Sequence, residues 1–183
     1  MKKLMFMIAA VAMAACAQAA TVSWTCTNVK DGTGSAISGV AYFVNAATLS
    51  QGDLAALSGA DAFNTALSGM YSWTPATAGK YTEADGVANA TLGLSDATAS
   101  QAYLVIFDTA TITDASKYYV TEVKSFNTFS GTETQQVKWG SQSTPSQAAG
   151  AWTSVSGSAV PEPTSGLLML VGLAGLALRR RRA

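Results

Sequence analysis

The side chains available for chemistry in the middle of this chain are few. The sequence has no histidine, and between Ala20 and Ala159 it has no arginine. Ser-His-Asp and Cys-His catalysis and histidine metal sites are therefore excluded by inventory. The same span holds five lysines and ten acidic residues, a net charge of −5. This charge argues against nucleic-acid binding, which needs clustered Lys and Arg.

Carboxylates are the main groups left for acid–base work. Glu83 and Asp85 could in principle flank a glycosidic bond, where two carboxyls stand roughly 5 to 9.5 Å apart. Two acids two residues apart near a turn are more typical of a solvated loop. Asp31 and its following glycines could open a calcium loop, but further acidic ligands are missing, so a turn is expected. We therefore expect that the protein is not an enzyme and that it has no catalytic residue, no cofactor and no metal site.

Aromatic rings offer a second kind of chemistry, because they can stack on sugars. The four tryptophans are Trp24, Trp73, Trp139 and Trp152. Rings of this kind also fill small β cores, so a carbohydrate-binding or adhesive domain and a structural role both stay open. Two or more exposed, coplanar tryptophans would favour sugar binding. Four buried tryptophans would rule out the sugar-binding hypothesis.

Two smaller motifs have structural interpretations. Cys26 alternates with polar residues on the apolar face of a strand, which predicts a buried thiol. Asn89-Ala90-Thr91 matches a glycosylation sequon, which we interpret as incidental.

The N-terminus has the three parts of a secretory signal peptide. Lys2 and Lys3 precede an apolar run over 4–15, and small residues follow. That run is too short for a stable membrane span, which favours cleavage. Ala17 and Ala19 are the small residues that a signal peptidase inspects, so the mature chain is expected to begin at Ala20.

A lipoprotein signal is the alternative for the same residues. The sequence Met-Ala-Ala-Cys over 13–16 loosely matches a lipoprotein box, in which Cys16 would be acylated and become the first residue.

The C-terminus combines a proline motif, an apolar segment and a basic cluster. Pro161, Glu162 and Pro163 precede an uncharged run over 166–178. A cluster of four arginines follows: Arg179, Arg180, Arg181 and Arg182. The apolar run is thin for a bilayer, but arginine side chains can extend to the interface. Positive clusters stay on the cytoplasmic side, so the body is expected outside the inner membrane.

This order of elements resembles the PEP-CTERM sorting domain of Gram-negative bacteria over 160–183, with an ordinary short membrane anchor as the alternative. The resemblance implies processing by an exosortase, a membrane peptidase for which Pro161, Glu162 and Pro163 are substrate residues. It also implies an inner-membrane intermediate, then a surface or extracellular location, and a possible partner in extracellular polysaccharide or biofilm matrix. Whether the tail is removed or retained stays open.

These signals divide the chain into four parts: a signal peptide over 1–19, a β-rich domain over 20–140, a Ser/Gly/Ala-rich spacer over 141–159 and the sorting segment over 160–183. Period-two spacing predicts an antiparallel hairpin from strands near 22–26 and 40–44. The apolar run over 103–107 predicts a central strand buried on both faces, with a partner over 117–124. Shorter strands are expected near 87–94, 134–139 and 151–155.

One amphipathic helix is expected over 51–68. Ser50 and Asp53 form a capping box, and the apolar stripe of the helix should pack on a sheet. The fold class is mainly β: an antiparallel sandwich or compact barrel with one inserted helix, α+β as the alternative, and a C-terminal hydrophobic helix.

Overall fold

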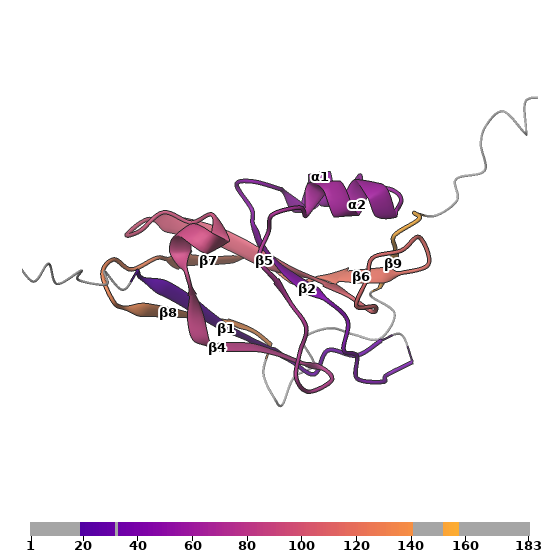
Figure 1. The fold of residues 1–183 in the computed structure, drawn as a ribbon, viewed down its shortest axis with the longest axis horizontal. Helices are drawn as coiled ribbons and strands as arrows, with labels where there is room; N and C mark the ends of the chain where they lie inside the picture. Colours follow the sequence, from indigo (N-terminus) through magenta and orange to yellow (C-terminus); the bar gives the residue numbers. More distant parts are fainter. Residues whose placement is uncertain (1–18, 32, 141–151, 158–183) are drawn as a thin grey trace, which may run out of the picture.

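Alternating apolar residues build two β-sheets that pack face to face (Figure 1). The structure is a computed structural model and describes residues 19–31, 33–140 and 152–157. The smaller sheet has the order β4 (Lys80–Ala88), β1 (Thr21–Thr27), β8 (Thr134–Trp139). The larger has the order β3 (Ser72–Trp73), β2 (Ala41–Asn45), β5 (Ala99–Phe107), β6 (Lys117–Val120), β9 (Thr153–Ser154), and β7 (Lys124–Asn127) also pairs with β5.

β5 is the central strand of the larger sheet and is buried on both faces. Its even-numbered residues 102–106 point into the core between the sheets. Its odd-numbered residues 103–107 point into a second core under the helices. The predicted central strand is therefore confirmed, and so is its antiparallel partner β6.

The helices α1 (Gln51–Ala55) and α2 (Ala60–Ala66) cover the face of the larger sheet that points away from the smaller one (Figure 1). Ser50 caps the helix as predicted, because its Oγ accepts from the Asp53 N–H at 3.1 Å, and its hydroxyl donates to Asp53 Oδ2 at 2.7 Å. The prediction of one continuous helix over 51–68 was wrong, however. Gly59 has φ +86°, outside the helical region, and Ala60 N donates to Asp114 Oδ1 at 2.7 Å, so a second helix begins there.

The predicted hairpin between the first two strands is also wrong. β1 pairs with β4 on one side and, in parallel, with β8 on the other, whereas β2 pairs with β3 and β5. The two strands instead face each other across the core, where the rings of Trp24 and Phe43 lie 5.0 Å apart between centroids. The segment between them passes from one sheet to the other.

The remaining strand predictions had mixed outcomes. β8 matches the strand expected near 134–139, and β9 lies within that expected near 151–155. Of the strand expected near 87–94, only the first residues belong to β4, and a 3₁₀ helix, η1 (Asn89–Leu92), follows.

The described part of the chain is mainly β, and its sheets do not close into a barrel, so the compact-barrel alternative is wrong. The expected C-terminal hydrophobic helix lies outside the described residues. Among those residues no helix has the length and apolar character to cross a bilayer. Within the segment expected to be a spacer, residues 152–157 pack on the body, and Val155 is fully buried.

Candidate functional site

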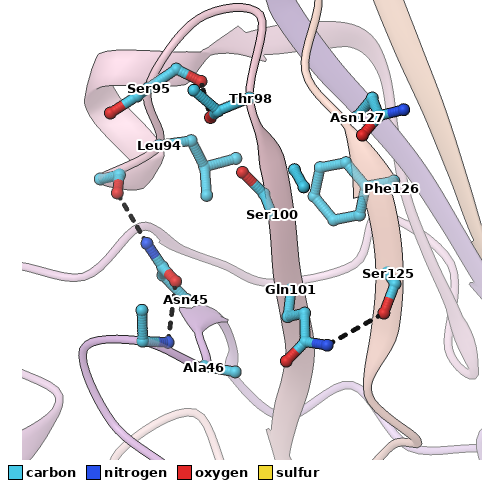
Figure 2. A pocket seen from close by; sticks show the side chains of 13 residues that line it. Asn45, Ala46, Leu94, Ser95, Thr98, Ser100, Gln101, Ser125, Phe126 and Asn127 are labelled. Atoms are coloured by element: carbon cyan, nitrogen blue, oxygen red, sulfur yellow. Dashed lines mark hydrogen bonds between the residues drawn. The ribbon is translucent and has the colours of Figure 1, made fainter.

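A pocket of about 730 Å³ opens where β2 ends and β5 continues past it (Figure 2). β2 pairs with β5 only as far as Asn45, opposite Ala102. The preceding part of β5, residues 99–101, pairs with β7 on one side and with no described strand on the side of β2. The pocket therefore lies at a notch in the larger sheet. Its lining residues are Asn45, Ala46, Ala47, Gly93, Leu94, Ser95, Thr98, Ala99, Ser100, Gln101, Ser125, Phe126 and Asn127.

Asn45 holds the two loops beside the notch. Its Nδ2 donates to the Gly93 carbonyl at 2.7 Å, and its Oδ1 accepts from the Ala47 N–H at 3.0 Å. Figure 2 shows both bonds as dashed lines on the β2 side of the pocket. Ala46 N also donates to the Gln101 carbonyl at 2.9 Å, which seals the end of the strand pair.

The opposite wall is the loop over 93–98, which is fixed by its own side chains. Thr98 Oγ1 donates to the Ser95 carbonyl at 2.9 Å, and Thr98 N donates to Thr128 Oγ1 at 3.0 Å. Asn89, only 2% exposed, donates from Nδ2 to Asp96 Oδ1 at 2.7 Å. These bonds hold the wall in place before any ligand arrives.

The lining is polar but uncharged. None of the lining residues that the structure describes carries a formal charge. Gln101 Nε2 donates to Ser125 Oγ at 3.1 Å, so the amide oxygen of Gln101 keeps its acceptor capacity for a ligand. Phe126 is half-buried and, like the buried Leu94, packs on the core between the sheets. The volume falls within the range of small-molecule sites, roughly 300–1,000 Å³.

This chemistry suits a neutral ligand with many hydroxyl groups. Amide and hydroxyl side chains both donate and accept hydrogen bonds, as sugar hydroxyls do. A charged ligand would find no counter-charge in the lining, and an anion would also meet the acidic excess of the body.

Of the residues predicted to direct sorting and signal cleavage, the structure describes Ala19. Pro161, Glu162, Pro163, the arginine cluster, Cys16 and Ala17 fall outside the described residues. Ala19 is exposed, whereas Ala20 is fully buried and its carbonyl accepts from the Asn89 N–H at 3.0 Å. Ala20, the predicted first residue of the mature chain, is therefore the first buried residue of the described part.

The tryptophans do not form an exposed aromatic platform. Trp24 and Trp139 are 2% and 1% exposed and fill the core between the sheets. Trp73 is half-buried against Trp24, and its ring plane is tilted 60° from it. Trp152 is half-buried beside Tyr119. A sugar site built on stacked tryptophans therefore has no support.

The carboxylates singled out in the sequence lie on strand β4 and in a turn. Glu83 accepts from the Tyr71 hydroxyl at 2.9 Å, while Asp85 is exposed. Burial of Tyr71, together with Glu83, raises the pKa of Tyr71 to about 12. Among the described residues no three His, Cys, Asp or Glu side chains gather as metal ligands would.

Asp31 and Cys26 occupy the positions expected of them. Asp31 Oδ1 accepts from the Thr33 and Ser35 N–H groups at 2.8 and 2.9 Å, which closes a turn. Hydrogen bonds from Thr33 and Ser35 lower the pKa of Asp31. Cys26 is fully buried, as predicted.

Sequence reasoning missed the pocket. Its polar residues come from the end of β2, the loop over 93–98 and the paired ends of β5 and β7, and no local motif joins these segments. The only local signal is the excess of Ser, Thr, Asn and Gln at strand ends, which is also typical of ordinary turns.

No curated protein and no solved structure matches this chain. Residues 159–182 match the PEP-CTERM protein-sorting motif, and the rest of the chain is not covered by that match. The tail of this chain is therefore a PEP-CTERM sorting motif, the signal of surface proteins that an exosortase processes.

Proposed function

We propose that this chain is an exported, non-enzymatic protein of the cell surface or extracellular matrix, sorted through its tail. The match of residues 159–182 to the sorting motif is the observation that carries the proposal. A signal peptidase cleaves after Ala19, and an exosortase-type membrane peptidase recognises Pro161, Glu162 and Pro163. The arginine cluster keeps the end of the tail on the cytoplasmic side while the body lies outside.

The test compares Glu162→Ala with Glu133→Ala, which removes an exposed acidic side chain from the body. Intact-mass and terminal-peptide analysis of cell, membrane and medium fractions follows both ends of the chain. The wild type and Glu133→Ala should begin at Ala20 and lose the tail, whereas Glu162→Ala should keep Ala183 and stay in the membrane fraction. The same masses report any acylation of Cys16.

Two results would overturn the sorting proposal. One is native protein in the cytosol with Met1 and Ala183 both intact. The other is Glu162→Ala processed as fast as the wild type.

We also propose that the body binds neutral saccharide chains of the extracellular polysaccharide in the pocket at the end of β2. The uncharged lining, rich in amide and hydroxyl side chains, supports this. Gln101 is the residue best placed to bond a sugar hydroxyl, because it is exposed and its amide is already oriented by Ser125.

Titration calorimetry and NMR would test this with neutral glucose, galactose, mannose and N-acetylglucosamine oligomers of three to six units. One lost hydrogen bond is worth about 1 kcal/mol, so Gln101→Ala should weaken binding about fivefold. Gln136→Ala, an exposed strand glutamine in the other sheet, should leave it unchanged. Absence of saturable binding to every oligomer, or equal binding by Gln101→Ala, contradicts the proposal.

A further inference from the structure

Residues 152–157 are the last part of the chain that the structure describes, and they are fastened to the body at several points. We name them the C-terminal clasp. β9 within the clasp pairs with β6, with Thr153 opposite Tyr118 and Ser154 opposite Lys117. Trp152 Nε1 donates to the Lys30 carbonyl at 2.7 Å.

Val155 is the anchor of the clasp. Its side chain is fully buried in the core under the helices. Its N–H donates to the Ser116 carbonyl at 2.9 Å, and its carbonyl accepts from the Gly59 N–H at 2.8 Å. Ser58 Oγ also donates to the Ser156 carbonyl at 3.1 Å. The clasp therefore bridges the larger sheet and the loop between α1 and α2.

The sorting motif begins very close to this anchored end. Only three residues, 158–160, separate Gly157 from Pro161. Even a fully extended chain covers about 14 Å from Gly157 to Pro161. A body of this size has a radius of gyration of about 14 Å, and the polar layer of a bilayer adds several more ångströms. A docked clasp thus holds the motif within about one body radius of the folded surface.

A membrane peptidase must enclose the chain on both sides of the bond that it cuts. With the clasp docked, the body occupies the space on the N-terminal side of the motif. We infer that the docked clasp shields the sorting motif, and that release of the clasp from β6 precedes processing by the exosortase. This inference rests on the proposed sorting function.

A disulfide lock tests the inference, using Ser58→Cys combined with Gly157→Cys in the full chain. A Cβ at position 157 would lie 3.9 Å from Ser58 Cβ, within the roughly 3.5–4.5 Å that a disulfide spans. The bond can form in an exported protein, because the compartments beyond the inner membrane are oxidising. The two single variants are the controls, since Gly157→Cys alone carries any strain from its φ of +71°.

The readout is the fraction of chains that have lost Ala183 over time. The oxidised double variant should lose its tail at least ~10-fold more slowly than either single variant, because the released population is suppressed. Reduction with dithiothreitol should restore the rate. Eight Gly/Ser residues inserted between Gly157 and Ser158 should also restore it in the oxidised double variant, because they add up to about 28 Å of reach.

Processing of the oxidised double variant at the rate of the single variants would overturn the inference. So would failure of the insertion to restore processing while reduction does. Neither result is confused with failure of the sorting proposal, in which the wild type itself keeps Ala183.

Discussion

Asn89 fixes the start of the 3₁₀ helix η1 and the loop wall of the pocket. Its Nδ2 donates to Asp96 Oδ1 at 2.7 Å and to the Phe129 carbonyl at 3.3 Å. A buried amide with these partners is not accessible for glycosylation in the folded protein, although it begins a sequon.

Replacing Asn89 by Ala should lower the free energy of unfolding by about 1 kcal/mol, because the hydrogen bonds from its buried amide to Asp96 Oδ1 and to the Phe129 carbonyl are lost. Thr91→Ala removes the same sequon at an exposed position and should change stability little. Urea denaturation measures both. Equal stabilities of the two variants would contradict the structural role given to Asn89.

Tyr103 should make the protein sensitive to alkali. Burial, with a smaller contribution from Asp53, raises the pKa of Tyr103 to about 12. An unfolded tyrosine ionises near 10, so the contribution of Tyr103 to stability is complete below about pH 10 and is lost as the pH rises toward 12. Denaturation midpoints from pH 8 to 12 should fall more steeply for the wild type than for Tyr103→Phe. Parallel curves would show that another group controls alkaline unfolding.

At the scale of elements, the division between α1 and α2 depends on Gly59. Its φ of +86° and ψ of 150° form a conformation that is essentially restricted to glycine, and a residue with a Cβ adopts it at a cost of about 1–3 kcal/mol. Gly59→Ala should therefore destabilise the protein by about that amount. Gly52→Ala lies inside α1, where the added Cβ would meet only Ser50 Oγ at 3.7 Å, and should stabilise by about 0.5–1 kcal/mol. Thermal unfolding of both variants checks the opposite signs.

The sequence predicts the beginning of this helical region but not its division. Ser50 and Asp53 are only three residues apart in the chain, so this helix cap is visible locally. Asp114, which accepts from the Ala60 N–H, lies 54 residues further on, and no local pattern reveals it. The acceptor that allows a second helix to start there is supplied by tertiary structure.

Strand partners were harder to predict than strand faces. Period-two spacing in β1 correctly placed Trp24 on a buried face. In the second strand it selected Val40, Tyr42 and Val44, which face the core under the helices. It missed Phe43, which is buried in the core between the sheets. It says nothing about which strand lies alongside, so the two strands were paired with each other when they belong to different sheets. The run in β5 was easier, because a strand that is apolar on both faces belongs in the middle of a sheet. The pocket was hard to predict for the same reason as the strand partners, because its residues come together only once the strands are paired.

For the molecule as a whole, Trp139 ties the two sheets together. It lies at the end of β8 in the smaller sheet, and its ring meets Phe43 of the larger sheet edge-on, with centroids 6.1 Å apart. Its Nε1 donates to the Glu122 carbonyl at 2.9 Å, in the turn between β6 and β7.

Trp139→Ala should lower the free energy of unfolding by about 3–5 kcal/mol, the usual cost of removing a large buried ring. Trp139→Phe, which keeps an aromatic ring but loses the hydrogen bond, should cost less. Guanidinium denaturation followed by circular dichroism measures both. Little loss in the alanine variant would show that the sheets are held together elsewhere.

The parallel pairing of β1 with β8 affects the order in which the body can fold during export. β1 leads the body, and Thr21 lies beside Thr134, with their hydroxyl oxygens 2.8 Å apart although the two residues are 113 positions apart in the sequence. β1 is the middle strand of the smaller sheet. If the chain is exported amino end first, one edge of β1 stays unpaired until β8 has also crossed the membrane. Contacts between segments so distant in the sequence form slowly, so the smaller sheet is still unfolded when the chain enters a translocation channel.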